Sequence, residues 1–416
     1  MARFLHIADI HLGFDRYNSP ERTKDFYYSL SDAIQRYAIA EQVDFVLIVG
    51  DLFEHRVIQP AVLNQAQLCF QALQAAGIPV LAIEGNHDNT PYGTSTSWLK
   101  YLSQWGLLKL LEPGDLKAGE SLYTPWNEAQ KRGGYIDLPC DVRIIGSAWY
   151  GAAAPQAIPQ IADAIANLPP GPKHTLLMFH HGLEGQIARY SGALRYGDLL
   201  PLQTAGVDYL ALGHIHKSYS VEGWIFNPGS LEANNIEESN YTRGAYLAEF
   251  TDAGVKASLK QDYQQRPVVR LQVTTRGEES EEELVQLATT AIEDAIAQAK
   301  IIPNEHPIVE LRIEGSVGFE RLSIDTKALQ QTLQTLSQAL IFLLKYEVEE
   351  VAFQSPTSDE ASREDIEHTA FLDFLAGHRD YKKRAEELAH ALVDLKQRSL
   401  KGDSEDDLYR YVNELF

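Results

Sequence analysis

Side chains that can bind metal ions or transfer protons recur in five short segments of the first half of the chain. In chain order they are Asp9 and His11; Asp51; Asn86, His87 and Asp88; His180 and His181; and His214 and His216. Carboxylate and amide oxygens combined with imidazole nitrogens, without a thiolate, favour Mn, Fe, Zn or Co over a closed structural zinc site. The set holds too many ligands for one ion, so at least one carboxylate is expected to bridge two. Ions ~3.5–4 Å apart are typical of in-line displacement at phosphorus, where they activate water and neutralise phosphoryl oxygens.

Each segment taken alone is weak or moderate support for such a site. An Asp-x-His pair is typical of a solvated loop, and the Gly-Asp pair at residues 50–51 is typical of an ordinary turn. The Gly-Asn-His-Asp segment at 85–88 and the Gly-His-x-His segment at 213–216 are less common, because paired histidines on one loop are costly to keep for packing alone. All five segments in this order predict one joint site.

Short apolar runs in this half of the chain are predicted to be strands, and five of them end just before the polar segments. The runs are residues 4–7, 45–49, 80–83, 142–145, 176–179 and 209–212. They alternate with predicted helices, including residues 21–42 and 155–172, which is the pattern of an α/β or layered α–β domain. Open α/β sheets carry their sites at the C-terminal ends of strands. Glycines before Asp51, Asn86 and His214 permit the sharp turns that bring backbone and ligand close together.

This ordered set of motifs resembles the calcineurin-like metallophosphoesterases, and the longer motifs are similar to those of the SbcD-like DNA double-strand-break repair exonucleases. The matching segments are IADIHLG at 7–13, GDLF at 50–53, IEGNHD at 83–88, GSAW at 146–149, YLALGHIHK at 209–217 and NPGSLE at 227–232. The resemblance implies an α+β fold over residues 1–262, built as a layered α-β-β-α sandwich. It also implies a small α/β capping domain at 263–353 and a helical C-terminal region at 354–416, where only the domain order is similar.

The resemblance also implies a role for each polar residue. One metal ion is held by Asp9, His11, Asp51 and His216, and the other by Asp51, Asn86, His180 and His214. His87 protonates the leaving oxygen or stabilises charge on it, and Asp88 orients the His87 imidazole. His180 directly follows its strand and is the expected ligand, with His181 as the alternative. The implied cofactor is a pair of divalent ions, Mn²⁺ before others.

One position departs from the family pattern. Many relatives have His directly after Gly-Asp-Leu-Phe, where it helps to handle duplex ends, but this chain has Glu54 there, followed by His55. Three alternatives stay open at this point: His55 substitutes through a shifted turn, the processing of duplex ends is altered, or His55 is merely exposed.

The second half of the chain has the pattern of a βαβαβ domain followed by a charged helical tail. Strands are predicted at 268–273, 308–313 and 340–351, helices at 280–299 and 327–339, and tail helices at 362–375, at 380–397 and after Ser404. Two tail helices carry apolar stripes at helical spacing. The stripes are Ala385, Leu388, Ala389, Leu392 and Leu395, and Leu408, Tyr411, Val412 and Leu415. The resemblance implies that this region binds an SbcC-like coiled-coil ATPase by a helix-in-groove mode, although such stripes often pack on their own domain.

Composition limits the surroundings in which the chain is expected to work. The 416 residues include 36 basic and 58 acidic side chains, a formal net charge of −22, which argues against tight autonomous binding to DNA. Residues 13–24, with Arg16, Tyr17, Arg22 and Lys24, and also Lys100, are the expected local contacts to a strand backbone. Only two cysteines occur, no apolar run reaches the ~20 residues of a membrane helix, and no signal-peptide pattern opens the chain. We therefore expect a cytoplasmic, nucleoid-associated protein.

Taken together, the sequence predicts a two-metal-dependent DNA exonuclease and endonuclease that hydrolyses phosphodiester bonds at DNA ends. It would be the nuclease subunit of an SbcC–SbcD-like repair complex and a homodimer. A phosphatase or small-molecule phosphodiesterase of the same fold would share every metal ligand and is the first alternative. The second is a scaffold that tethers DNA ends and whose catalysis is incidental.

Overall fold

The chain divides into two compact units, Met1–Val268 and Val269–Phe416, in a computed structural model. The structure describes residues 2–114, 121–187, 192–350, 362–376 and 381–415. The expected boundary between residues 353 and 354 lies outside the described residues. Within the described part of the chain, no helix is both long enough and apolar enough to cross a bilayer.

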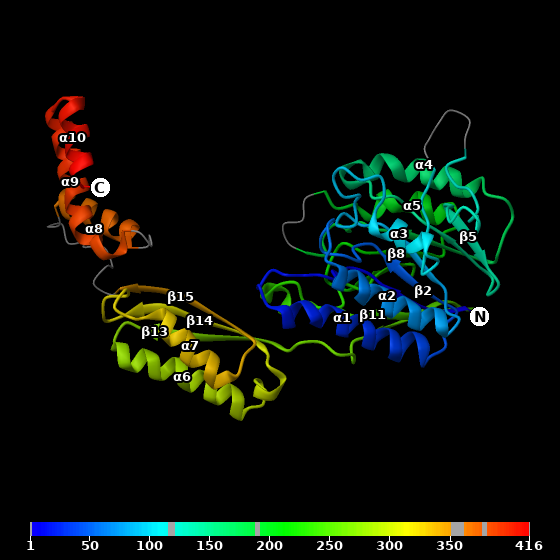
Figure 1. The fold of residues 1–416 in the computed structure, drawn as a ribbon, viewed down its shortest axis with the longest axis horizontal. Helices are drawn as coiled ribbons and strands as arrows, with labels where there is room; N and C mark the ends of the chain where they lie inside the picture. The colour runs from blue at the N-terminus through cyan, green and yellow to red at the C-terminus, as the bar shows by residue number, and fades with distance from the viewer. Residues whose placement is uncertain (1, 115–120, 188–191, 351–361, 377–380, 416) are drawn as a thin grey trace. The chain divides into compact units, whose positions relative to one another are not determined.

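The first sheet of the N-terminal unit gathers the strands that lead into three of the polar segments (Figure 1). Its order is β12 (Gly254–Lys260), β11 (Ala245–Thr251), β1 (Ala2–Ile7), β2 (Phe45–Val49), β3 (Val80–Ile83) and β4 (Lys109–Leu110). Strands β1 to β4 run parallel, and β11 pairs antiparallel with both β1 and β12. The C-terminal ends of β1, β2 and β3 therefore meet at one edge of the sheet.

The second sheet supplies the other two polar segments. Its order is β5 (Tyr135–Leu138), β6 (Val142–Ile145), β7 (His174–Phe179), β8 (Tyr209–Leu212), β10 (Ile225–Asn227) and β9 (Tyr219–Val221). Strands β6, β7, β8 and β10 are parallel, while β5 and β9 form antiparallel edges. All the predicted strands of this half form, and β2, β3, β6 and β8 have the predicted bounds.

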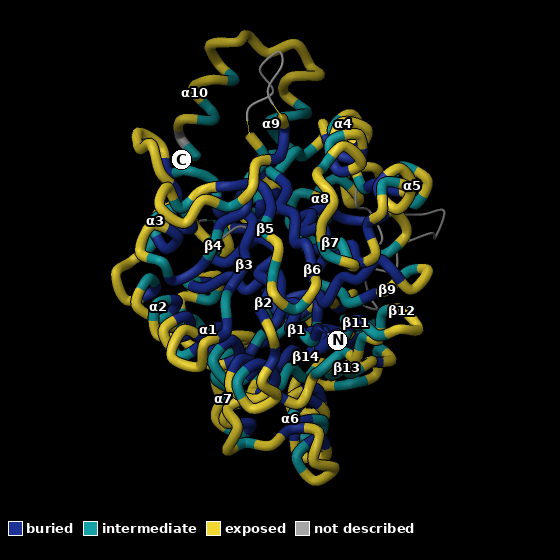
Figure 2. Tube along the Cα trace, turned by 90° about the vertical axis from the view of Figure 1, so that its right-hand side faces the viewer, coloured by how far each residue is buried: buried dark blue, intermediate teal, exposed yellow. Residues whose placement is uncertain are grey.

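Side-chain alternation along these strands builds four layers. Phe4 and Leu47 of the first sheet share one core with Leu176 and Met178 of the second, so the two sheets pack face to face. The opposite faces are covered by helices (Figure 2). On the first sheet these are α1 (Pro20–Ile34), α2 (Pro60–Ala75) and α3 (Trp98–Gln104), and on the second α4 (Ala154–Ala166) and α5 (Tyr196–Thr204). The predicted α-β-β-α sandwich is confirmed.

The predicted helix at 21–42 differs in its second half. Its regular part ends at Ile34, and Gln35–Ile39 forms a π-helical turn in which the Ala40 amide donates to the Gln35 carbonyl, five residues back. Within this turn, the Tyr37 hydroxyl donates a hydrogen bond to the Asp262 carboxylate. A periodicity of apolar residues does not distinguish the two kinds of turn over so short a stretch.

The C-terminal unit begins with the predicted βαβαβ arrangement. It comprises β13 (Val268–Arg276), α6 (Glu281–Ala297), β14 (Ile308–Val317), α7 (Thr326–Ser337) and β15 (Ile341–Glu350), with β14 central in the sheet. Ser280 caps α6 through a capping box with Glu283. Buried Glu310 on β14 pairs with Arg270 on β13 at 2.8 Å and with Lys345 on β15 at 2.9 Å. Charge thus ties all three strands together.

The tail folds into α8 (Arg363–Ala376), the short turn Lys382–Arg384, α9 (Ala385–Lys401) and α10 (Glu405–Leu415). Leu388 and Ala389 of the predicted α9 stripe are buried with Leu375 and Ala376 of α8, and Leu322 of the βαβαβ part packs against this cluster. The α9 stripe therefore packs on its own unit instead of facing outward.

Candidate metal centre

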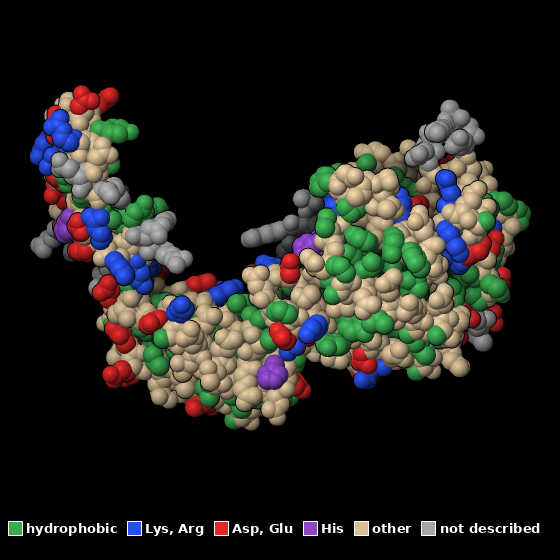
Figure 3. Space-filling view, in the orientation of Figure 1, with side chains coloured by type: hydrophobic (Ala, Val, Ile, Leu, Met, Phe, Trp, Pro, Cys, Tyr) green, Lys and Arg blue, Asp and Glu red, His purple; other side chains and the backbone are tan. Residues whose placement is uncertain are grey.

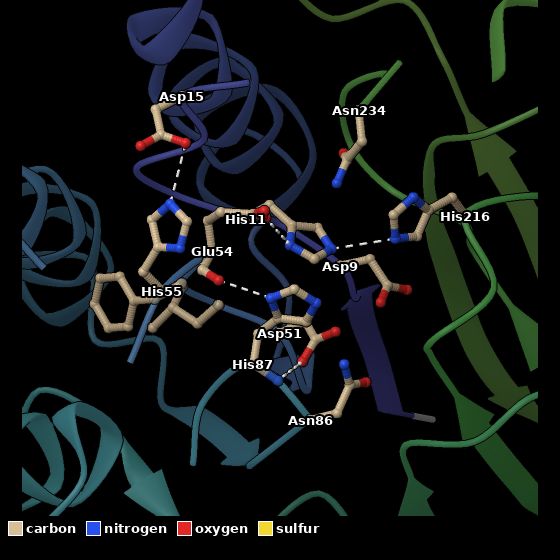
Figure 4. Close-up of polar contacts among 12 residues, drawn as sticks. Asp9, His11, Asp15, Asp51, Glu54, His55, Asn86, His87, His216 and Asn234 are labelled. Atoms are coloured by element: carbon tan, nitrogen blue, oxygen red, sulfur yellow. Dashed lines mark hydrogen bonds and ion pairs between the residues drawn. The ribbon is translucent and has the colours of Figure 1, made fainter. Parts of the chain in front are cut away.

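The five polar segments converge where strands from both sheets end. Figure 4 shows Asp9, His11, Asp51, Asn86, His87 and His216 of this centre. Ligand atoms of Asp9, His11 and His216 lie within 4.8 Å of one another, and so do those of a second group, Asp51, His180 and His214. Asp9 and His11 follow β1, Asp51 follows β2, His180 follows β7, and His214 and His216 follow β8. Each group thus combines residues from both sheets.

The first group holds two imidazoles that face each other. The Nε2 atoms of His11 and His216 are 3.1 Å apart. The other ring nitrogen of each is next to a carboxylate, with His11 Nδ1 2.7 Å from Glu54 Oε2 and His216 Nδ1 3.1 Å from Glu238 Oε1. With the ring proton of each histidine on Nδ1, beside its carboxylate, both Nε2 lone pairs point at the same place, where a cation relieves their repulsion. The residues present therefore fit a divalent metal ion.

In the second group, the side-chain amide oxygen of Asn86 lies close to the carboxylate and the two imidazoles. Asn86 Oδ1 lies 3.2 Å from His180 Nε2 and 2.8 Å from His214 Nδ1, and Asp51 Oδ2 lies 3.3 Å from His180 Nε2. His180 Nδ1 donates to the Val49 carbonyl at 2.8 Å, which leaves Nε2 as the ligand nitrogen. Hard oxygens with borderline nitrogens again match a divalent transition metal.

Charges in this buried cluster are strongly coupled. Burial opposes a charge on His180, but Asp51 and Asp9 outweigh it and raise the pKa of His180 to about 9. Burial and the charge of His180 lower the pKa of His214 to about 3. For Asp51 burial acts in the opposite direction, yet His180 and His11 hold its pKa below the ordinary value. Asp51 therefore stays ionised and able to bind a cation across the physiological range.

Backbone strain is concentrated on the same residues. Four of the predicted ligands have positive φ: Asp9 at 51°, His11 at 53°, Asp51 at 52° and His214 at 82°. Residues with a Cβ rarely adopt this region, and each instance costs of order 1–3 kcal/mol. Strain of this kind persists where the surrounding structure enforces it, and it is typical of functional sites.

Two of the predicted glycines are required by close approach. A Cβ at Gly50 would lie 2.3 Å from His180 Nδ1, and one at Gly85 would lie 2.1 Å from Asp51 Oδ1. Gly50 also has φ +80°, which favours glycine. The expectation that glycine permits these turns is confirmed at both positions.

His181 lies outside both ligand groups. Its two ring nitrogens face the carbonyls of Gly182 and Gly151 at 3.2 and 3.1 Å, and its ring stacks on Trp149. Burial lowers the pKa of His181. Of the two alternatives, the geometry favours His180 as the ligand.

His87 and Asp88 lie beside the ligands, but not in the expected relation to each other. His87 Nδ1 contacts the Glu54 carbonyl oxygen at 2.7 Å, and no carboxylate orients its ring through that nitrogen. The buried Asp88 carboxylate accepts backbone N–H groups from Leu52, Phe53 and Gly85 at 3.0–3.2 Å. Asp88 therefore fastens the loops after β2 and β3 together, which corrects its predicted role.

Two carboxylates of the centre are missing from the site that the sequence predicts. Glu54 enters the sequence prediction only as a departure from the family pattern, and Glu238 lies in the short helix Ile236–Asn240, which does not directly follow a strand. Glu238 is fixed by the Asn234 backbone N–H at 3.0 Å and the Asn235 amide at 2.8 Å. A glutamate 22 positions after its histidine has no spacing signal, so only the fold relates them.

His55 is half-exposed and contacts Asp15 at 3.1 Å.

Two of the expected contacts to a DNA backbone have other partners. Arg22 is only 1% exposed and pairs with Asp25 at 3.0 Å and Glu232 at 3.3 Å, so it is a core residue. Lys100 pairs with Glu112 at 3.2 Å. A basic residue near the start of a helix can equally pair with a carboxylate of its own unit, which composition alone does not reveal.

Comparisons with known proteins place these observations in context. Residues 2–218 match the family model described as calcineurin-like phosphoesterase. The chain is 31% identical over 249 residues to the DNA double-strand break repair protein Mre11 of Archaeoglobus fulgidus, covering 57% of this chain and 52% of that protein. It is 26% identical over 328 residues to the protein of the same description from Saccharolobus solfataricus, covering 76% of each. The chain thus spans about half the length of the first relative and about three quarters of the second.

Proposed function

Because this chain belongs to the calcineurin-like phosphoesterase family, we propose that it is a two-metal-dependent nuclease that hydrolyses phosphodiester bonds at DNA ends. The observation that carries the proposal is the convergence of two ligand groups, each assembled from both sheets. The DNA substrate is supported by the similarity to relatives described as double-strand break repair proteins. A role in such repair follows, together with a cytoplasmic, nucleoid-associated location.

The metal ions would be held by the predicted ligands. We propose Asp9, His11 and His216 for one ion and Asn86, His180 and His214 for the other, with Asp51 shared between them. When bound, two such ions, proposed as Mn²⁺, supply a hydroxide near neutral pH and neutralise charge on the phosphoryl oxygens. Glu54 and Glu238 keep the Nε2 atoms of His11 and His216 turned toward the centre.

His87 is the proposed proton donor to the leaving oxygen. Its Nδ1 donates to the Glu54 carbonyl, so Nε2 is the nitrogen left for substrate, and it delivers a proton from the doubly protonated ring. The ring packs edge-on against His11, at 4.9 Å between centroids, which keeps it beside the ligands without joining the predicted set. Asp51 Oδ1 accepts a hydrogen bond from the His87 backbone N–H at 2.8 Å and so fixes the backbone from which the imidazole extends. General acid catalysis requires this combination of proximity and an unliganded ring.

The tail is the proposed binding site for an SbcC-like coiled-coil ATPase. Because the α9 stripe is buried on its own unit, the partner would contact the apolar side chains that remain outside: Ile366, Phe374, Leu400 and Tyr409, of which the last three are each 75% exposed. The tail also carries charged side chains of both signs on its surface (Figure 3). Because the chain has a formal charge of −22, it binds DNA poorly by itself, and the partner would supply the positive potential that DNA binding needs. We also propose that the nuclease is a homodimer.

The deciding experiment compares substrates under metal titration. Purified protein is given Mn²⁺ with single-stranded and duplex oligonucleotides, and separately with nitrophenyl phosphate and a nitrophenyl phosphodiester. We expect Mn²⁺-dependent cleavage of oligonucleotides from their ends, lost in Asp51→Asn. Efficient turnover of the small esters with intact oligonucleotides would instead establish the phosphatase or small-molecule phosphodiesterase alternative. Binding of DNA ends without turnover of either substrate class would favour the scaffold.

A further inference from the structure

A second cluster of potential ligands lies in the C-terminal unit, on the facing surfaces of α8 and α9. His368 is on α8, and Glu386 and His390 are one helical turn apart on α9. Residues at i and i+4 lie on the same face of a helix, and Glu386 and His390 both lie next to His368 of the neighbouring helix. The imidazole centroids of His368 and His390 are 3.9 Å apart.

The distances within this cluster match ligands more closely than hydrogen bonds. Glu386 Oε1 lies 3.7 Å from the Nε2 atom of His368 and 3.7 Å from that of His390. Hydrogen bonds between such atoms are 2.7–3.2 Å long. Bond lengths of about 2.0–2.2 Å around a tetrahedral zinc ion place its ligand atoms roughly 3.3–3.5 Å apart. A small inward movement of flexible side chains would complete the coordination.

His368 contributes a second, independent observation. Its Nε2 atom is buried and has no hydrogen-bond partner among the described residues. A buried polar atom without a partner is unfavourable, and an ion at this point would satisfy it. Glu386 and His390 are 66% and 70% exposed on their side chains, so an ion from solution can reach the cluster.

The neighbouring carboxylates already have cationic partners. Glu367 contacts Arg363 at 2.9 Å and also Lys396, and Glu387 contacts Arg384 at 2.8 Å. Glu386, in contrast, has the two imidazoles as its partners within the described part of the chain. The local charge therefore favours a bound cation at Glu386 and not at its neighbours.

We propose that His368, Glu386 and His390 bind a divalent transition-metal ion, Zn²⁺ in the first place, and that this ion links α8 to α9. Two imidazoles and one carboxylate form an open zinc site with a fourth position for water. The nitrogen ligands exclude Mg²⁺ and Ca²⁺, which take oxygen ligands. This site belongs to the C-terminal unit and does not depend on the proposed nuclease function.

The test counts zinc ions bound to the full chain. Protein stripped with a chelator is reloaded with Zn²⁺, passed through a desalting column and analysed for metal by mass spectrometry. We expect His390→Ala and Glu386→Gln each to bind one zinc ion fewer per chain than the wild type. Glu387→Gln, an exposed substitution at the next position, should retain the wild-type content. When Co²⁺ replaces Zn²⁺, His390→Ala and Glu386→Gln should lose the visible absorption that this tetrahedral site contributes, and Glu387→Gln should keep it.

The design separates this site from the centre in the N-terminal unit. All variants keep the Asp9–His216 centre intact, so ions bound there cancel in the comparison. His390 is exposed on a helix, where alanine is favourable, and circular dichroism verifies the fold. Equal zinc content in the wild type and both site variants would overturn the proposal, whether or not the protein cleaves DNA. Loss of the same ion in Glu387→Gln would also overturn it, because the effect would not be specific to the three ligands.

Discussion

Replacing Glu54 by glutamine isolates the contribution of one carboxylate to the metal centre. The Glu54 side chain reaches His11 Nδ1 at 2.7 Å, while its backbone carbonyl contacts His87. Glu54→Gln preserves the backbone contact and the side-chain length and removes only the negative charge. The substitution should therefore weaken the hold on His11 and leave the position of His87 unchanged.

The expected size follows from the geometry of this contact. The Glu54 carboxylate lies 2.7 Å from His11 Nδ1, which is ion-pair distance, although the two atoms are not aligned as a hydrogen bond. The Glu54 side chain is 18% exposed and that of His11 is 2% exposed, so water compensates poorly for the loss. Loss of such a partner of a metal-bound histidine typically reduces metal affinity or activity 10–100-fold, or about 1.4–2.7 kcal/mol. We expect the Mn²⁺ concentration for half-maximal cleavage to rise by this factor.

The measurement is a Mn²⁺ titration of oligonucleotide cleavage for the wild type, Glu54→Gln and His55→Ala. His55 is the matched control because its half-exposed ring contacts Asp15, a surface pair worth at most ~1 kcal/mol, and no metal ligand. Cleavage at saturating Mn²⁺ should recover most of its rate in Glu54→Gln, and His55→Ala should have the wild-type titration. An unchanged titration for Glu54→Gln would refute the reasoning. A larger effect of His55→Ala would instead show that His55 has taken over the role of the missing histidine.

Four further outcomes can be checked with single changes. Asp51→Asn should lower turnover by several orders of magnitude and reduce bound metal, so full activity would rule out a shared carboxylate. His87→Ala should keep its metal content but lose roughly 10²–10⁴-fold in cleavage rate, and loss of both ions would make His87 a ligand. Glu310→Gln should lower the free energy of unfolding at neutral pH by ~1–3 kcal/mol in denaturant titrations. Burial opposes ionisation of Glu310, but Lys345 and Arg270 outweigh it and lower its pKa. Its contribution to the free energy of unfolding is therefore present above the unfolded pKa of ~4.3 and is lost as the pH falls through the lower folded pKa. The variant should lose less stability than the wild type on acidification. Truncation after Phe353 should leave short-oligonucleotide cleavage nearly intact and abolish ATPase binding, and co-purification of the truncated chain would refute the proposed site.

The sheet that carries the centre could be predicted because its strands are short and buried on both faces. The run at 45–49 is apolar at every position and buried throughout, so its bounds coincide with those of β2. The polar residues begin where the apolar run ends, and Gly50 marks that point in the sequence. A buried strand followed by glycine and a carboxylate is thus a local signal that needs no tertiary information.

The residues that orient the ligands could not be predicted, because their contacts are made only by the fold. His216 and Glu238 belong to different loops, and Glu54 meets His11 across 43 positions of chain. The direction of the α9 stripe is a related case. Periodicity in Leu388 and Ala389 indicates an amphipathic helix, but it does not tell whether α8 or another protein covers the apolar face.

Alignment of the two sheets is what brings the separate strand ends into one centre. His6 lies on β1 between the sheets, with Nδ1 3.0 Å from the Tyr209 hydroxyl and Nε2 2.9 Å from the Leu212 carbonyl at the end of β8. Burial lowers the pKa of His6 to about 3, so the ring is neutral at physiological pH and can donate one hydrogen bond and accept the other. Just beyond this contact, the His214 backbone N–H donates to both oxygens of Asp9 at 3.0 and 2.9 Å. The strained backbones of Asp9 and His214 are therefore held against each other by a neutral, buried link between the sheets, which stays in place whatever charge the ligands and their ions carry.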